Sequence, residues 1–522
     1  MTAALRLTAE DLREVALEKG VCVRPIVHEV HDTETGQVHY VPTPCGARRA
    51  SKCPPCAEKA RRLRMQQCRE GWHLEEEPER EPNEAPDPDD ADDAEEKPRR
   101  VRSTRRRQDT PDLPRLEVDD RTVGRAFTTA SGRTYRPSMF LTFTLPSYGR
   151  VRADGTPVDP SRYDYRRAAL DAMHFPKLVD RMWQNLRRAV GFKVQYFAAV
   201  EPQRRLAPHL HVAVRGAIPR AAIRQVTAGT YHQVWWPAFD HPVYDTQAPV
   251  WSREAGYVAP DTGAPLPTWQ KALDELDADD EARPAHVIRF GRQMDIQGII
   301  ASEDDADRRV AYLTKYLSKS FVEAYADEDH SSARQRAHMR RLQEEVRWLP
   351  CSPRCWNWLR FGIQPQGARE GMVPGSCPAK IHDGEHLGCG GRRVLVSRLW
   401  TGKTLKEHKA DRAEVVRQVL LAAGIEKPEV DRLSVMVKAK DGTQRFHWEI
   451  HDPMDSTVPI YRQVMTHAIA EHLRWKSEYE TAKARAGPVT TLVRPPDSQP
   501  PCGAAAAVKG ERSESRSDPK GP

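Results

Sequence analysis

Apolar and polar residues form patterns that predict a folded region of mixed strands and helices between about residues 119 and 325. Runs rich in apolar, β-branched and aromatic residues predict strands at 138–145, 193–201, 208–215, 286–291 and 295–301. Apolar residues at helical spacing, or a proline or acidic start, predict helices at 162–190, 219–228 and 304–325. Residues 237–285 are rich in Pro, Asp, Gly and Trp, which indicates an irregular insertion into this region.

The segments on either side of this region carry their own, shorter patterns. A helix is predicted within residues 1–20, and a hairpin over 21–41 with its turn at Glu34-Thr-Gly36. Near the other end, the pattern predicts two helices and a hairpin, at 404–423, 455–485 and 433–450. These flanking elements are expected to form smaller units beside the central region.

Composition divides the chain further. Its 522 residues exceed the size of one hydrophobic core, only 39% are hydrophobic, 30% are charged, and 42 are prolines. Such a chain is expected to hold several folded modules joined by unstructured segments. The predicted divisions are an N-terminal region 1–72, a disordered linker 73–117, a central domain 118–328, a Cys/His-rich region 329–400, a C-terminal helical and hairpin region 401–486, and a disordered tail 487–522.

Charge is strongly segregated, although the net charge is only +7 from 81 Lys and Arg against 74 Asp and Glu. Residues 70–97 are dominated by Glu, Asp and Pro, and residues 99–107 by Arg, which is typical of a solvated linker. No stretch approaches the ~20 apolar residues of a membrane span, and residues 1–20 lack the apolar core of a signal peptide. The chain is therefore predicted to be cytoplasmic, with no membrane partner.

Two histidines separated by one residue, His209 and His211, lie in the strand predicted at 208–215. Successive side chains of a strand point to opposite faces, so both imidazoles project together while Leu210 points into the core. Glu201 ends the preceding predicted strand, and it would lie beside the imidazoles if the two strands pair. One carboxylate and two imidazoles suit Mg²⁺ or Mn²⁺ with open positions for phosphate oxygens, although Zn²⁺ or Co²⁺ would also fit. The pattern predicts a catalytic metal site.

About a hundred residues later, the sequence Tyr-Leu-Thr-Lys-Tyr-Leu-Ser-Lys spans 312–319. On one continuous helix, Tyr312, Lys315, Tyr316 and Lys319 share a face, while apolar residues form another. A phenol has a pKa near ~10, so neighbouring ammonium groups and a metal are needed to favour the phenolate. Attack by a tyrosine on a phosphodiester gives a phosphotyrosine linkage that keeps the bond energy for religation. The second tyrosine would allow a second cut while the first is occupied.

Three segments in this order resemble the successive motifs of HUH endonucleases, which initiate rolling-circle replication. These segments are FLTFTLP at 140–146, Glu201 with PHLH at 208–211, and YLTKYLSK at 312–319. The YxxKYxxK form resembles the two-tyrosine branch. The strings CGARRASKCPPCAEKARR and GGRRVLVSRLWTGKTL resemble those of replication initiators from actinobacterial plasmids and integrative conjugative elements. The core resemblance covers about 120–325, and the actinobacterial resemblance covers most of 40–410.

The resemblance implies an α+β fold with an HUH-type central antiparallel sheet and flanking helices. It implies metal ligands at Glu201, His209 and His211, nucleophiles at Tyr312 and Tyr316, and lysines near the scissile phosphate or metal at Lys315 and Lys319. The implied activity is metal-dependent, site-specific nicking and strand transfer on single-stranded DNA at a replication origin. A 5′-phosphotyrosyl intermediate would form and free a 3′-hydroxyl primer.

Other functions remain open at this point. A two-tyrosine HUH transposase would use the same chemistry and can also carry an N-terminal zinc region. A conjugative relaxase fits less well, because its tyrosines usually precede the histidines in sequence. A zinc-containing DNA-binding regulator without enzymatic activity is the alternative from a different class.

Most of the ten cysteines fall into two clusters, which favours zinc binding over disulfides in a cytoplasmic chain. The ligands predicted for the first site are Cys45, Cys53, Cys56 and Cys68. Arginines around that cluster would suit a DNA backbone. The second cluster offers more than four ligands, since His386 and Cys389 lie close by. The set favoured there is Cys351, Cys355, Cys377 and His382.

The sequence Gly402-Lys403-Thr404 is not an ATP-binding loop. That motif requires a glycine five residues before the second glycine, and position 397 is a serine. Unwinding of DNA is therefore expected to come from a host helicase partner or from supercoiling. The sequence leaves the oligomeric state open.

Overall fold

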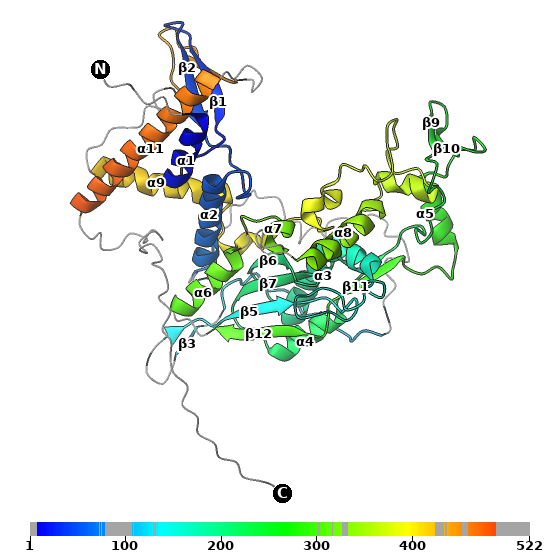
Figure 1. Cartoon of the computed structure of the whole chain (residues 1–522). Helices are drawn as coiled ribbons and strands as arrows, with labels where there is room; N and C mark the ends of the chain where they lie inside the picture. Colours follow the sequence, from blue (N-terminus) through cyan, green and yellow to red (C-terminus); the bar gives the residue numbers. More distant parts are fainter. Residues whose placement is uncertain are drawn as a thin grey trace, which may run out of the picture.

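The computed structural model describes residues 8–72, 74, 76–78, 107, 109–124, 126–128, 132, 134–299, 303–315, 317–325, 332–422, 433, 436–451 and 458–486. Elements near both ends of the chain gather in one lobe, which we call the terminal lobe (Figure 1). The main sheet and its helices form a central lobe, and an arm extends from it (Figure 1). Within the described ranges, every helix is too short or too polar to cross a lipid bilayer.

The central lobe is built on an antiparallel sheet of five strands. Their order across the sheet is β12 (Met294–Ile299), β5 (Ser138–Phe143), β7 (Pro208–Arg215), β6 (Tyr196–Pro202) and β13 (Val394–Val396). The first four strands fall where the hydrophobic pattern predicts them. The edge strand β13 comes from the Cys/His-rich region, so that region completes the sheet of the central lobe.

One face of the sheet packs against the long helix α3 (Tyr165–Val190) and the shorter α4 (Arg220–Gly229). Leu210, Val212 and Val214 of β7 point to this side and are fully buried. Trp183 of α3 stacks on Tyr196 with ring centroids 3.8 Å apart. This face is therefore the main apolar core.

The opposite face carries α6 (Glu303–Thr314) and α2 (Pro54–Trp72). Val310 and Leu313 of α6 pack on the sheet, and Trp400 fills the space beside α2. The Trp400 indole donates to the carbonyl of Gln67 at 3.1 Å. Gly71 lies so close that an added Cβ would fall 2.2 Å from the Trp400 ring, so only glycine fits there. This packing fixes α2 across the sheet.

The tyrosine helix is shorter than predicted, because α6 ends at Thr314 and a separate helix, α7 (Phe321–Tyr325), follows. The Ser320 hydroxyl accepts from the Glu323 amide at 3.0 Å, and the Glu323 carboxylate accepts from the Ser320 amide. This reciprocal cap starts a new helix and stops the first from continuing. The prediction of one continuous helix over 304–325 is therefore wrong.

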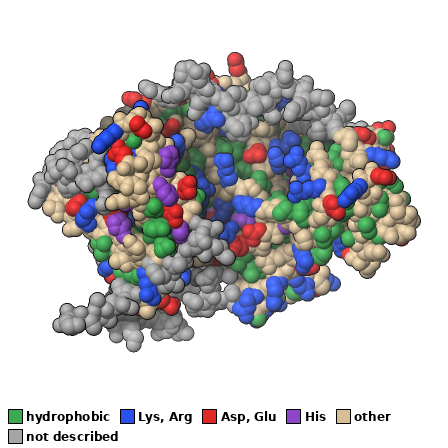
Figure 2. Space-filling view, turned by 90° about the horizontal axis from the view of Figure 1, so that it is seen from above, with side chains coloured by type: hydrophobic (Ala, Val, Ile, Leu, Met, Phe, Trp, Pro, Cys, Tyr) green, Lys and Arg blue, Asp and Glu red, His purple; other side chains and the backbone are tan. Residues whose placement is uncertain are grey.

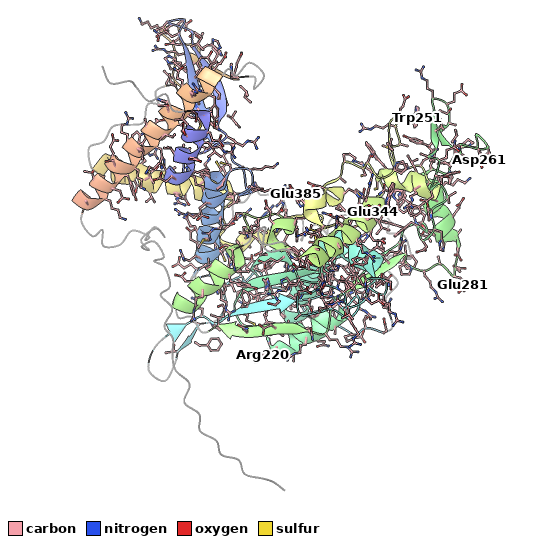
Figure 3. All side chains as sticks on the ribbon, in the orientation of Figure 1. Arg220, Trp251, Asp261, Glu281, Glu344 and Glu385 are labelled. Atoms are coloured by element: carbon pink, nitrogen blue, oxygen red, sulfur yellow. The ribbon has the colours of Figure 1, made fainter. Side chains whose placement is uncertain are left out.

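The segment predicted as an irregular insertion contains regular structure. Its flanks pair as β8 (Tyr231–Val234) with β11 (His286–Arg289), and the arm holds β9 (Val250–Ser252), β10 (Gly256–Val258) and α5 (Trp269–Ala278). Trp251 and Asp261 lie out on this arm, well away from Glu385 (Figure 3). Tyr257 anchors the arm, since its hydroxyl donates to the carbonyl of Met372 at 3.0 Å.

The terminal lobe joins the two ends of the chain. Its helices are α1 (Ala9–Lys19), α9 (Leu405–Ala422) and α11 (Val458–Ala486), and its sheet has the order β14 (Phe446–Ile450), β1 (Ile26–Asp32) and β2 (Val38–Thr43). The N-terminal hairpin is present as predicted. Within the hairpin predicted at 433–450, Lys438 forms an antiparallel bridge with Gln444, and the strand that follows, β14, also pairs with β1, where His28 lies opposite Ile450.

The remaining described elements cover the central lobe. Helix α8 (Ala333–Trp348) packs along α3, and short 3-10 turns follow at Trp356–Phe361, Lys380–His382, Gly384–His386 and Arg398–Trp400. A small ribbon is formed by β3 (Phe127–Thr128) and β4 (Thr134–Tyr135). Most of the predicted linker and all of the predicted tail lie outside the described residues. Residues 109–117, predicted within the linker, contact the lobe, where the Leu116 amide donates to Arg188 O at 2.7 Å.

Candidate metal and tyrosine site

Strand register brings the three predicted metal ligands together. In the β6–β7 pair, Glu201 stands directly opposite His209, and Ala199 opposite His211. Alternation along the strands puts all three ligand side chains on the face that carries α6 and α2, while Leu210 enters the core as predicted. Ligand atoms of Glu201, His209 and His211 lie within 4.8 Å of one another, which is close enough to share one ion.

Thr142 of β5 orients the inner histidine. Register places Thr142 opposite His211, and its hydroxyl lies 3.0 Å from Nδ1 of that imidazole. When Nδ1 carries the ring proton and donates it to the threonine, Nε2 keeps a lone pair for a ligand. Nε2 faces Glu201 Oε2 at 3.7 Å and the Tyr312 hydroxyl at 3.1 Å.

Burial sets the charge states of this group. It lowers the pKa of His209 to about 3, with the neighbouring His211 adding to the effect, and lowers the pKa of His211 to about 4. Both imidazoles are therefore neutral near pH 7, as metal ligands must be. Burial raises the pKa of Glu201 to about 7, although Arg393 and Lys315 oppose the shift. The nearby positive charges of Arg393 and Lys315 are too weak to offset the cost of burying the ionised carboxylate.

The donors fit a divalent cation. Among the described residues, Glu201 Oε1 and His209 Nδ1 are buried polar atoms that have no hydrogen-bond partner. Such atoms cost free energy unless something satisfies them. A bound cation would satisfy the carboxylate oxygen and would supply the positive charge that the Glu201 environment lacks. Two neutral imidazoles and one carboxylate form a suitable ligand set.

Tyr312 reaches the metal ligands from α6. Besides its contact with His211 Nε2, its ring meets the His211 ring edge-to-face with centroids 4.9 Å apart. Phe140 packs against both rings at 6.0 Å, and the Arg309 guanidinium lies over Phe140. The tyrosine is nevertheless 41% exposed. The hydroxyl is thus held beside the candidate metal ligands, while part of the tyrosine side chain remains exposed.

The other residues of the predicted tyrosine motif are arranged less simply. Lys315, in the turn after α6, is close enough to Glu201 to oppose the rise in the pKa of that carboxyl. Lys319 lies beyond the end of the helix, and its carbonyl accepts from Arg393. Tyr316 is outside the described residues.

Arg393, which sequence reasoning did not single out, connects the ligand strand with the loop after the tyrosine helix. Its guanidinium donates to the carbonyl of Lys319 and, through Nε, to Val200 O at 3.3 Å. It also lies over the Phe321 ring, 4.6 Å from the centroid. Arg393 precedes β13, so only the unforeseen fifth strand brings it here. Thr142 also was not predicted as a site residue, although it lies in the segment FLTFTLP that resembles an HUH motif.

The first cysteine group differs from the predicted one. Sulfur atoms of Cys22, Cys45, Cys53 and Cys56 lie within 4.8 Å of one another, and the prediction that Cys68 is the fourth member is wrong. Cys56 and Cys68 are both on α2, and twelve residues of helix separate them by roughly 18 Å. Cys68 is buried against Trp400 instead. Cys22 reaches the group because the β1–β2 hairpin brings its two ends together.

The second cysteine group has the members that were predicted. Cys351, Cys355, Cys377 and His382 present ligand atoms within 4.8 Å of one another. Cys355 Sγ lies 3.3 Å from Nε2 of His382, while Nδ1 of that imidazole lies 2.9 Å from the Val346 carbonyl. A proton on Nδ1 donated to that carbonyl leaves Nε2 free to act as a ligand.

Comparisons with known proteins agree on one role. The family model "RepSA: Replication initiator protein, pSAM2" matches residues 8–87 and 78–471. A replication initiator protein of Streptomyces ambofaciens is 26% identical over 273 residues, which are 43% of this chain and 54% of the relative. The chain thus spans about half the length of this curated relative. No solved structure matches the chain. Because the family model matches most of the chain, this protein belongs to the RepSA family of replication initiators.

Proposed function

We propose that this replication initiator is an HUH-type endonuclease that starts rolling-circle replication. It would nick one strand of origin DNA and hold the 5′ end on Tyr312. The nicked strand keeps a free 3′ hydroxyl that serves as primer. A host helicase is the proposed partner for unwinding. The family match favours replication over the transposase alternative.

One observation carries the proposal: the Tyr312 hydroxyl lies 3.1 Å from Nε2 of a histidine whose neighbours are the other two metal ligands. A nucleophile held beside a metal site can attack a phosphate bound to that metal. The order along the chain, with Glu201 and the histidines before the tyrosine, matches the order of the HUH motifs. The antiparallel sheet that carries them is consistent with an HUH fold.

The chemistry is a substitution at phosphorus. The Tyr312 oxygen bonds to phosphorus, and the bond from phosphorus to the 3′ oxygen breaks. The phenol proton passes to water at the exposed side of the ring, and the departing 3′ oxygen takes a proton from water. The products are a 5′-phosphotyrosyl bond and a 3′ hydroxyl. The reverse reaction rejoins the strand without any outside energy source.

The side chains around Tyr312 each contribute to this step. Phe140 packs against the tyrosine ring, so the hydroxyl is oriented before substrate arrives. Lys315 lies close enough to add positive charge where the phosphate would sit. A divalent cation bound by the Glu201, His209 and His211 set would offset the negative charge that builds on the phosphate oxygens. Tyr316 is proposed to act in the second transfer that ends a round of replication.

The proposal is tested with labelled single strands that tile the origin of the native replicon. Incubation with Mn²⁺ is expected to give a protein–DNA adduct that survives denaturation, and chelation by EDTA is expected to prevent it. Peptide mapping of the adduct should place the nucleotide on Tyr312. A double His209→Ala/His211→Ala variant is the control for metal dependence, and it is expected to give no adduct.

The opposite outcome would point to a different function. If no strand of either polarity forms an adduct, while the protein still binds origin duplex DNA, the chain is a DNA-binding regulator. An adduct that forms equally well in EDTA would show that cleavage does not require a divalent cation.

Replacing Thr142 by valine should weaken metal binding without disturbing the core, because valine has nearly the same shape but cannot bond to Nδ1 of His211. Loss of such a supporting bond typically costs 10- to 100-fold in metal affinity. Titration calorimetry with Mn²⁺ measures the change. Thr142→Ser keeps the hydroxyl and should bind Mn²⁺ nearly as well as the native protein. Equal weakening in both variants would show that the hydroxyl has no role.

We further propose that both cysteine groups hold structural Zn²⁺. The purified protein should then contain two equivalents of zinc by elemental analysis. Cys22→Ser is expected to lower this to one equivalent, because it removes a ligand from the first group. The matched control is Cys68→Ser, which alters a buried cysteine of the same region outside the group and should leave two equivalents. Loss of zinc in Cys68→Ser instead would restore the ligand set predicted from sequence.

A further inference from the structure

Several arginines come together at the end of the sheet that carries the metal ligands. Residue Val394 of β13 pairs with Ala199 of β6, so Arg392, two positions earlier, lies at the Glu201 end of that strand pair. The amide of Ala50 donates to Ser318 O at 2.8 Å, which ties the loop that carries Arg48 to the loop after Tyr312. Two distant segments thus meet beside the site.

Helix α2 adds a third arginine. Its C-terminal half is fixed under Trp400, at the far end of the sheet, by the bond from the indole to Gln67. Arg64 lies about one turn earlier, is half-buried, and is close enough to Arg48 and Arg392 for their charges to act on it. The same helix contacts the tyrosine helix, because Arg69 pairs with Asp307 at 2.8 Å. Arg64 therefore lies on a helix that also contacts the tyrosine helix.

Within the described part of the chain, these three side chains lack acidic partners. Arg64 donates to the Gln67 side chain at 2.7 Å, and no described carboxylate lies within ion-pair distance of Arg48, Arg64 or Arg392. The contrast is Arg49, which pairs with Glu385 and lies 3.1 Å from Nε2 of His386. Glu385 sits on the side of the central lobe that faces α2 (Figure 3).

Electrostatics agree with this convergence. Burial, together with the positive charges of Arg48 and Arg392, lowers the pKa of Arg64 to about 10. Like charges held together without counter-ions destabilise a protein, and an anion bound between the three guanidinium groups would offset this repulsion. Seen from above, Lys and Arg side chains line the hollow between the two lobes (Figure 2).

We propose that Arg48, Arg64 and Arg392 form a phosphate-binding cradle for the DNA strand held at Tyr312. Guanidinium groups bind phosphate oxygens in bidentate fashion, and three groups from separate segments would grip consecutive phosphates without reading bases. The inference deepens the proposed function, because it names the path of the strand beside the nick. It also gives the N-terminal region a role, since α2 and the loop before it supply Arg64 and Arg48.

The test measures binding of fluorescein-labelled dT30 by anisotropy in EDTA, over a range of NaCl concentrations. The variant carries Arg48→Gln, Arg64→Gln and Arg392→Gln together. Each phosphate contact contributes about 0.7 to the slope of log affinity against log salt for single strands, so the slope should fall by about 2. Affinity near physiological salt should fall by roughly 10- to 100-fold.

A charge-matched control separates the cradle from a general loss of positive charge. It carries Arg62→Gln, Arg162→Gln and Arg417→Gln, each of which has its own carboxylate partner. This control should keep the native slope. An unchanged slope in the cradle variant, or an equal fall in both variants, overturns the proposal.

Two further measurements separate folding from binding. Without DNA, the cradle variant should melt at or above the native temperature, because the repulsion between the arginines has been removed. If this variant does not fold, the single variant Arg392→Gln, at an exposed position, should lower the slope of log affinity against log salt by about 0.7. Binding of dT30 in EDTA needs neither metal nor nucleophile. If no phosphotyrosyl adduct forms, the proposed nicking function fails but the cradle can still be supported by the salt slope. If an adduct forms and the cradle variant keeps the native salt slope, the cradle proposal alone fails.

Discussion

Tyr312→Phe should abolish the covalent adduct and reduce the rate of strand cleavage by roughly a thousandfold or more, as expected when a covalent nucleophile is lost. The substitution removes one oxygen, the atom 3.1 Å from His211 Nε2. A phenylalanine ring would still pack edge-to-face against Phe140, so the helix and its neighbours should be undisturbed. Single-turnover cleavage of a labelled origin strand measures the effect.

Tyr316→Phe is the matched comparison, since it makes the same chemical change four residues further along the sequence. The first cleavage should survive in this variant, while the second strand transfer should fail. Retention of the adduct in Tyr312→Phe together with its loss in Tyr316→Phe would assign the first attack to the other tyrosine. Retention in both single variants would mean that either tyrosine can start the reaction.

Cys355→Ser should cause the largest loss of stability among these variants. Cys355 is fully buried, lies in the main core, and faces Nε2 of His382 at 3.3 Å. Losing a structural metal belongs to the most costly class of substitutions, and the free energy of unfolding should fall on the order of 5 kcal/mol. Urea unfolding together with elemental analysis measures both effects, and one equivalent of zinc should be lost.

Cys389→Ala provides the control for this variant. Cys389 is also buried in the same core, but it is not a member of the metal-binding group. Its replacement should keep both zinc equivalents and cost only about 1–2 kcal/mol, from a small loss of packing. A similar loss of stability in both variants, with zinc unchanged, would mean that Cys355 acts only by packing.

The convergence of Glu201, His209 and His211 was predictable because it depends on local rules. Alternation along one strand placed Leu210 inside and the two histidines outside. The connection between β6 and β7 is so short that the strands had to pair as neighbours, which set Glu201 opposite His209. The two-residue periodicity of β7 and the short turn between β6 and β7 are therefore enough to predict that these three side chains meet.

The errors came from longer-range or competing effects. Helical spacing alone suggested that the tyrosine helix continues to residue 325, but the cap formed by Ser320 and Glu323 begins another helix. In the first cysteine group, the rise of the helix separates Cys68 from Cys56, and the meeting of the hairpin ends brings Cys22 in. Both signals were present in the sequence.

Some features had no local signal. Strand β13 joins the main sheet nearly two hundred residues after its partner β6, and a run of three apolar residues does not reveal where it will pair. Arg393 and Arg392 reach the site only through that pairing. Positions that depend on one distant strand are the ones that sequence periodicity cannot locate.

The pairing of β14 with β1 has a consequence for how this protein is made. During translation, the amino-terminal hairpin leaves the ribosome with one backbone edge unsatisfied, and its partner strand is synthesised more than four hundred residues later. The nascent chain must therefore wait until residues 446–450 have been made before this sheet closes. A message cut short before codon 446 would leave the edge bare, available to any other extended chain.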